Sequence, residues 1–82
     1  MKNQSEVDAI VDDTLSTLLK IDPSVVRFVD RATTTSWSSL MHVEIFFSLE
    51  EQFGVKFEDD DIAFAESRDD LVAAVERALG LG

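Results

Sequence analysis

The sequence contains no cysteine, so neither a disulfide framework nor a cysteine-based zinc site can stabilise it. For the same reason, any chemistry that needs a thiol would have to come from an added group. No run of apolar residues approaches the roughly 20 that a membrane-spanning helix needs, and the polar residues 1–6 are unlike a signal peptide. These absences predict a soluble cytoplasmic protein.

Basic residues are also scarce. Seven lysines and arginines stand against seventeen aspartates and glutamates, which gives a formal net charge of −10 at pH 7. Such a charge argues against nucleic acids and anionic membranes as partners and favours basic protein surfaces. Between Ser39 and Glu66 the one basic residue is Lys56. The acidic residues of this stretch are Glu44, Glu50, Glu51, Glu58, Asp59, Asp60, Asp61 and Glu66.

A chain of 82 residues forms one small domain, which we expect over residues 1–82. Apolar residues make up 45% of the sequence, and they recur with a helical period, which excludes a disordered chain. The sequence begins with Met1 and ends just after the expected last helix. We therefore expect a discrete protein and not an excised module.

A first helix is predicted over residues 5–20, with Ser5 as its N-cap and Asp22-Pro23 ending it. Its apolar stripe consists of Val7, Ile10, Val11, Leu15, Leu18 and Leu19. Residues 22–38 show no sustained period, and a connection of this length in a small domain is often functional. We expect its apolar residues to lie on the core: Val25, Val26, Phe28 and Val29.

A second helix is predicted over residues 40–53, ended by Gly54. Its apolar positions occupy more than one face. The core-facing set is expected to be Leu40, Ile45, Phe46, Leu49 and Phe53. Val43 and Phe47 would then lie on the side of Glu44 and Glu51, as an exposed apolar strip typical of a docking surface. The alternative is a crowded core that buries all of these side chains.

A short third helix is predicted over residues 59–65, with Ile62 and either Phe64 or Ala65 facing inward. Ser67 and Asp70 then resemble a capping box at the start of the last helix, which Gly80 ends. The stripe of the last helix consists of Leu71, Val72, Val75, Ala78 and Leu79. The predicted fold class is all-α, a four-helix bundle of three main helices and one short helix.

Two other functional interpretations have little support. His42 is the only histidine, and no strand–turn–helix nucleophile elbow surrounds Ser39, so we interpret His42 as a surface residue and not as part of a hydrolase site. Counted from Asp59, the acidic run has Phe64 where a calcium loop needs glycine and Asp70 where it needs a bidentate glutamate. We therefore expect neither an enzyme nor a dedicated metal site.

The strongest pattern lies at the start of the second helix. Residues 36–45 read Ser-Trp-Ser-Ser-Leu-Met-His-Val-Glu-Ile, and residues 49–54 read Leu-Glu-Glu-Gln-Phe-Gly. This pattern resembles the acyl and peptidyl carrier protein family. In that family a serine of an Asp-Ser-Leu motif opens the second helix, and Val-Glu-Leu/Ile and Leu-Glu-x-x-Phe segments follow. Aligning Ser39-Leu40 on the motif brings the later segments into register without a gap, and the order of elements agrees over essentially the whole chain.

The resemblance implies a bundle of acyl-carrier-protein type that carries 4′-phosphopantetheine on Ser39. A phosphopantetheinyl transferase would attach this group from coenzyme A with a divalent metal. The protein would then carry acyl or aminoacyl groups as thioesters, for example in fatty acid or polyketide biosynthesis. It would act as a monomer and meet ligases, condensing enzymes and tailoring enzymes that have basic docking patches. The partner-binding residues carried over from the family are Leu40, Val43, Glu44, Phe47, Glu50 and Glu51.

The position before Ser39 departs from the family pattern, because Ser38 stands where most relatives have aspartate. Serine keeps the ability to cap the helix, but it removes a carboxylate that the resemblance places near the transferase and its metal. Two alternatives remain open: a loaded carrier, and an acidic docking module that is never loaded. Ser38 is also a second candidate for the modified residue, although the register favours Ser39. Trp37 is expected to pack against the end of the long loop.

Overall fold

The computed structural model describes residues 4–81 of the chain, and its regular structure is helical. The elements are α1 (Gln4–Leu19), the 3₁₀ turn η1 (Val26–Phe28), α2 (Ser39–Phe53), α3 (Asp59–Phe64) and α4 (Arg68–Leu79). The predicted all-α fold of three main helices and one short helix is confirmed. The turn η1 is an element that the sequence did not predict.

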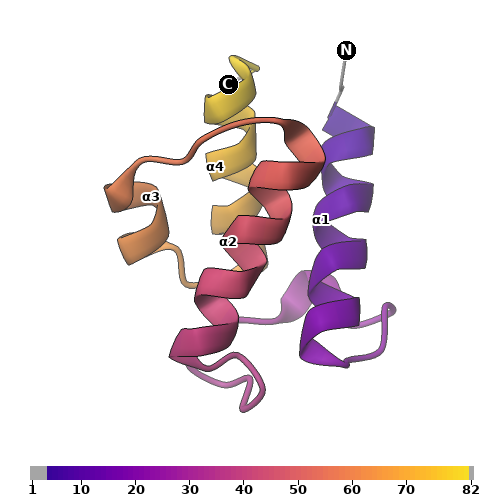
Figure 1. Ribbon diagram of the computed structural model, residues 1–82. Helices are drawn as coiled ribbons and strands as arrows, with labels where there is room; N and C mark the ends of the chain where they lie inside the picture. Colours follow the sequence, from indigo (N-terminus) through magenta and orange to yellow (C-terminus); the bar gives the residue numbers. More distant parts are fainter. Residues whose placement is uncertain (1–3, 82) are drawn as a thin grey trace.

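Three long helices form the bundle, and α3 lies to one side of it (Figure 1). Helix α1 packs against both α4 and α2 and runs in the opposite direction to them. The segment between α1 and α2 passes behind the lower part of α1 and forms a loop beside the first turn of α2 (Figure 1). No helix within residues 4–81 is long and apolar enough to cross a membrane.

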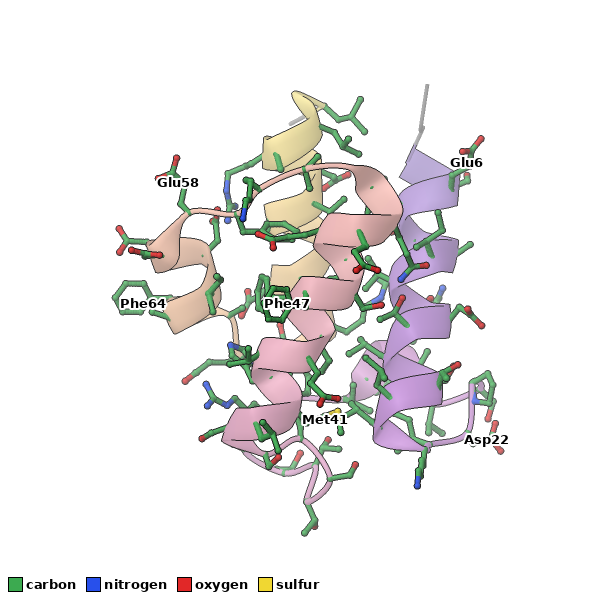
Figure 2. All side chains as sticks on the ribbon, viewed as in Figure 1. Glu6, Asp22, Met41, Phe47, Glu58 and Phe64 are labelled. Atoms are coloured by element: carbon green, nitrogen blue, oxygen red, sulfur yellow. The ribbon has the colours of Figure 1, made fainter. Side chains whose placement is uncertain are left out.

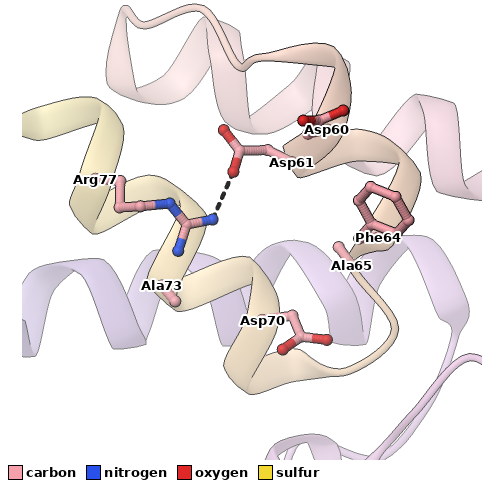
Figure 3. A pocket seen from close by; sticks show the side chains of 7 residues that line it. All are labelled: Asp60, Asp61, Phe64, Ala65, Asp70, Ala73 and Arg77. Atoms are coloured by element: carbon pink, nitrogen blue, oxygen red, sulfur yellow. Dashed lines mark hydrogen bonds and ion pairs between the residues drawn. The ribbon is translucent and has the colours of Figure 1, made fainter.

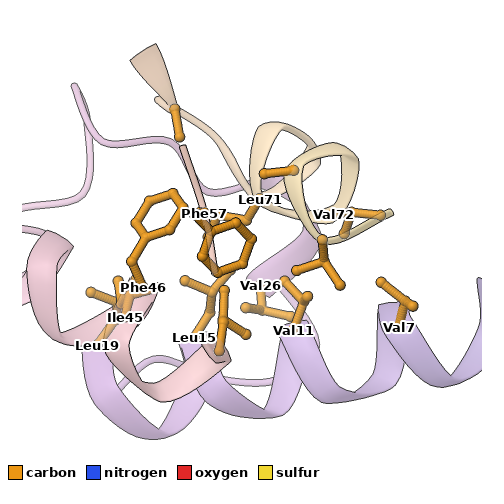
Figure 4. Packing of buried hydrophobic residues seen from close by; sticks show 14 of the residues in the cluster. Val7, Val11, Leu15, Leu19, Val26, Ile45, Phe46, Phe57, Leu71 and Val72 are labelled. Carbon is orange, nitrogen blue, oxygen red and sulfur yellow. The ribbon is translucent and has the colours of Figure 1, made fainter. Parts of the chain in front are cut away.

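The core lies where the apolar stripes of α1, α2 and α4 meet (Figure 4). In α1 the innermost side chains recur every four residues and are at most 1% exposed: Val7, Val11, Leu15 and Leu19. The buried apolar side chains of α2 and α4 are Ile45, Phe46, Leu49, Leu71, Val72, Ala74 and Val75. The predicted stripes are therefore confirmed in outline. In α4, however, Ala78 is exposed and Ala74 is buried in its place.

The ends of α1 differ from the prediction. Ser5 lies inside α1, so its prediction as the N-cap was wrong. At the other end, Lys20 follows the helix in a left-handed conformation with φ +57°, and the N–H of Ile21 donates to the carbonyl of Ser16. This is the bond pattern of a Schellman motif. The helix thus ends before the proline is reached, through a turn that usually contains glycine.

The prediction that the apolar residues of the long connection all lie on the core was wrong for two of them. Val26 is buried and Val29 is half-buried, whereas Val25 and Phe28 are exposed. The 3₁₀ turn explains this division because residues three apart share a face in it. Val26 and Val29 therefore face the core together, and Val25 and Phe28 point away together.

Around α3, the buried residue is Ala65 and not Phe64, which is 75% exposed. The capping box predicted for α4 is half formed. Ser67 Oγ accepts a hydrogen bond from the N–H of Asp70 at 3.2 Å, as expected of an N-cap. The carboxylate of Asp70, in contrast, accepts from the N–H of Glu66 at 2.8 Å and not from that of Ser67. The cap therefore also fixes the turn that leads into α4.

A partly buried ion pair joins α4 to α1. Arg68 Nε and Nη2 donate to the two carboxylate oxygens of Asp12 at 2.7 and 3.1 Å. A second carboxylate, that of Asp69, accepts from Arg68 Nη1 at 3.1 Å. These bonds, the one to Asp12 above all, raise the pKa of Arg68 above its usual value. The arginine therefore holds the two helices together as a permanently charged group.

Candidate functional site

Ser39 is the first residue of α2, one position earlier than the predicted start, and it is exposed. Ser38 is the N-cap of this helix, since its Oγ accepts from the N–H of Met41 at 3.1 Å. The predicted ability of Ser38 to replace aspartate as a cap is confirmed. Both serines are exposed, but the Ser38 hydroxyl caps the helix, whereas that of Ser39 has no part in the cap.

The Ser39 hydroxyl faces an arginine from the long connection. Arg31 Nη2 lies 3.4 Å from Ser39 Oγ, at the long end of hydrogen-bond distances. Sequence reasoning did not single out Arg31. It lies eight residues before Ser39, in a segment without periodicity, so nothing local to either residue relates the two.

The loop that carries Arg31 is attached to the turn before α4. The N–H of Arg31 donates to the carbonyl of Glu66 at 2.7 Å, and Asp30 forms an isolated antiparallel bridge with Ser67. Within the loop, Asp30 Oδ1 accepts from both the N–H and the Oγ1 of Thr33 at 2.8 Å. These bonds lower the pKa of Asp30 because they stabilise its charged form. The long connection is therefore a fixed structure at this point.

Trp37 and His42 form a buried polar contact next to the site. Trp37 is 3% exposed, which confirms that it packs inward at the end of the loop. His42 is only 4% exposed, so its interpretation as a surface residue was wrong. Its Nδ1 lies 3.0 Å from Trp37 Nε1, and its Nε2 lies 2.6 Å from the carbonyl oxygen of Ile62 in α3.

The tautomer of His42 follows from these partners. The indole N–H can only donate, so Nδ1 of His42 must accept, and Nε2 must carry the hydrogen that goes to the Ile62 carbonyl. His42 in this neutral form joins the loop end, α2 and α3 in one chain of hydrogen bonds. The histidine thus has a structural role, and its two ring nitrogens are both occupied.

The residues predicted to bind partners lie along one side of α2, and we call them the docking face: Leu40, Val43, Glu44, Phe47, Glu50 and Glu51. Its apolar members are spaced three and four residues apart, and their exposed fractions are 72% for Leu40, 48% for Val43 and 64% for Phe47. The exposure of Val43 and Phe47 confirms the predicted apolar strip and contradicts the alternative in which the core buries every apolar residue of the helix. The expectation that Leu40 faces the core was wrong, because it lies in the first turn of α2, on the side of this strip.

The acidic members of the docking face are not equivalent. Glu44 and Glu51 are exposed, whereas Glu50 is half-buried. Glu50 Oε2 accepts from the N–H of Phe57 at 3.0 Å and so holds the connector between α2 and α3. The two exposed carboxylates, Glu44 and Glu51, are therefore better placed than Glu50 to meet the expected partner.

A small groove lies beside the docking face, between α2 and α3, with a volume of about 140 Å³. Phe47 lies on the α3 side of α2, while Phe64 projects from the outer side of α3 (Figure 2). The groove residues are largely apolar: Val43, Phe46, Phe47, Glu50 and Ile62. The groove continues the apolar strip of the docking face toward α3.

A larger and more polar hollow, of about 330 Å³, lies between α3 and α4 (Figure 3). Its main internal contact is the ion pair between Arg77 and Asp61, which joins the two helices. Asp60 and Asp70 also line it. Within the described part of the chain, no three histidine, aspartate or glutamate side chains are grouped so that they could hold a metal ion.

No family model matches the chain, and no curated protein matches it. The functional conclusion therefore depends on the geometry around Ser39 and on the docking face. Together they place an exposed hydroxyl at a helix start, beside a guanidinium and next to an apolar strip flanked by carboxylates.

Proposed function

We propose that this protein is an acyl carrier protein that carries 4′-phosphopantetheine on Ser39. The observation that supports it best is the exposed Ser39 hydroxyl at the first position of α2, in register with the Leu40 and Glu44 positions of the carrier motif. A hydroxyl on a loop-to-helix turn is open to a modifying enzyme. The protein itself would not be an enzyme, and its role would be to place the bound group and present it to partners.

The residues around Ser39 fit a phosphodiester. The N–H groups of Ser39 and Leu40 have no acceptor within the helix, and the positive end of the helix dipole lies at the same place. Arg31 adds a positive charge within 3.4 Å of the oxygen that would be modified, and Ser38 adds no negative one. When attached, the group would supply the thiol that this cysteine-free chain lacks.

In the attachment step, Ser39 Oγ would form a bond to the phosphorus atom of coenzyme A that bears the pantetheine group. The bond from this phosphorus to adenosine 3′,5′-bisphosphate would break, and the bisphosphate would leave. The hydroxyl proton would leave to a base of the transferase, which also holds the divalent metal. The chain contributes the exposed oxygen and the docking face. Leu40, Val43 and Phe47 would enter an apolar depression on the partner, while Glu44 and Glu51 would pair with its lysines and arginines.

The test is the intact mass after incubation with coenzyme A, Mg²⁺ and a broad-specificity phosphopantetheinyl transferase. We expect the parent chain and Ser38→Ala to gain one phosphopantetheine group, and Ser39→Ala to gain none. Ser38→Asp restores the carboxylate of the family motif and is expected to load faster than the parent. A gain that persists in Ser39→Ala would contradict the assignment of the modified residue.

A second function is favoured by Ser38 itself. If the missing carboxylate abolishes the transferase reaction, the chain would be an acidic docking module that binds partners through the docking face and is never loaded. Loading of Ser38→Asp but not of the parent would support this second function within a carrier fold. A failure of all variants to load would overturn the carrier proposal.

A further inference from the structure

The neighbourhood of Arg31 distinguishes it from the arginines that hold the bundle together. Arg68 is paired with Asp12, and Arg77 is paired with Asp61. Among residues 4–81, by contrast, no carboxylate lies within ion-pair distance of the Arg31 guanidinium, and its hydrogen-bond partner is the neutral hydroxyl of Ser39. In a chain with seventeen acidic residues, this guanidinium thus lies within hydrogen-bond distance of a hydroxyl and of no carboxylate among the described residues.

The position of Arg31 is fixed from its backbone outward. Its N–H donates to the carbonyl of Glu66, and the adjoining Asp30 bridges to Ser67 and closes a turn on Thr33. Arg31 is also half-buried, which limits the freedom of its side chain. Contacts that do not involve Ser39 therefore hold the guanidinium near the Ser39 hydroxyl. Because folding has already ordered the backbone of Arg31, binding an anion there does not add that entropy cost.

Ser38 completes this arrangement. An aspartate at this position would place a carboxylate beside Ser39, where it could pair with the Arg31 guanidinium and would repel a phosphate. The serine that is present caps the helix without a charge. Arg31 is therefore left available for an anion attached to the neighbouring hydroxyl.

We propose that Arg31 binds the phosphate of the phosphodiester formed on Ser39, and so holds the attached arm against the loop. This inference rests on the proposed carrier function. Arginine and a phosphodiester form charge-assisted hydrogen bonds that are stronger than neutral ones. Binding of the phosphate by a residue of the folded state stabilises that state, so loading should stabilise this protein and should do so through Arg31.

The experiment compares the parent chain with Arg31→Gln, Arg31→Lys and Arg27→Gln, each fully loaded with excess transferase and checked by intact mass. Arg27 is the matched control because it is an exposed arginine of the same connection, in η1. For each variant, the melting temperature of the unloaded form is subtracted from that of the loaded form. At low salt we expect loading to raise the melting temperature by about 3 °C in the parent and in Arg27→Gln. The increase should be smaller in Arg31→Lys and absent in Arg31→Gln.

Nuclear magnetic resonance gives a second readout that does not depend on stability. The side-chain N–H signal of Arg31 and the ³¹P signal of the phosphodiester should both shift when the parent is loaded, and the ³¹P shift should differ in Arg31→Gln. Equal melting increments in Arg31→Gln and the parent, with an unchanged ³¹P signal, would overturn this inference alone. Failure of every variant to load would overturn it together with the proposed function.

Discussion

At the scale of single residues, two polar side chains in the first turns of α2 lie in opposite environments, and the sequence predicted only one of them. The hydroxyl of Ser39 is exposed, while the imidazole of His42 is buried and fully bonded. The local sequence could not predict this, because the partners of His42 lie on both sides of it in the chain. The Ile62 carbonyl that fixes its tautomer is 20 residues away.

His42→Phe should destabilise the protein by about 1–3 kcal/mol, as measured by urea unfolding followed by circular dichroism. Phenylalanine keeps a ring in the core but leaves Trp37 Nε1 and the Ile62 carbonyl without their partner. Trp37→Phe in the His42→Phe background is the control, and it should cost less than in the parent because the bond is already lost. Strictly additive losses would show that the Trp37–His42 contact contributes nothing.

At the scale of elements, the helices could be predicted from the sequence because their periodicity is local. The stripes of α1 and α4 and the stop at Gly54 depend on residues within a few positions of each other, and the structure confirms them except at Ala78. The start of α1 and the exposure of Val25 and Phe28 could not be predicted in the same way. The helix α1 begins before its expected cap, and the positions of Val25 and Phe28 depend on the unpredicted turn η1.

The end of α1 offers a test of helix termination. Lys20→Gly should stabilise the protein by about 0.5–1 kcal/mol in urea unfolding, because glycine adopts the left-handed conformation without the cost that a side chain brings. Gly54→Ala and Gly80→Ala are the opposite controls, since both glycines have positive φ and no atom within 4 Å of an added Cβ. Both are expected to destabilise by about 1 kcal/mol. A loss of stability in Lys20→Gly would mean that the Lys20 side chain stabilises the fold by more than its left-handed backbone conformation costs.

At the scale of the whole molecule, the net charge of −10 and the docking face would contribute separately to the proposed binding of partners. The exposure of Val43, Phe47, Glu44 and Glu51 could be predicted because one helix carries them all. The contact of Arg31 with Ser39 could not, because it arises from a bridge between the long connection and the turn before α4. The candidate site therefore combines a face of α2 that the sequence predicts with Arg31, whose position near Ser39 depends on the tertiary fold.

Glu51→Lys should slow the transferase reaction by about three- to tenfold at low salt, and the difference should diminish as the salt concentration rises. Asp13→Lys makes the same charge change at an exposed position of α1 and is the matched control. Rates are measured by intact mass over time, with circular dichroism to show that both variants remain folded. An equal slowing in Asp13→Lys would assign the effect to net charge and not to the docking face.

The buried position of Trp37 has an optical consequence. The chain has one tryptophan and no tyrosine, so its near-ultraviolet emission comes from a single indole two residues before Ser39. That indole is enclosed in the folded state and bonded to His42 at the edge of the candidate site. Its emission should shift to longer wavelength when the protein unfolds. One unlabelled signal would then report both on the integrity of the bundle and on changes at the candidate site.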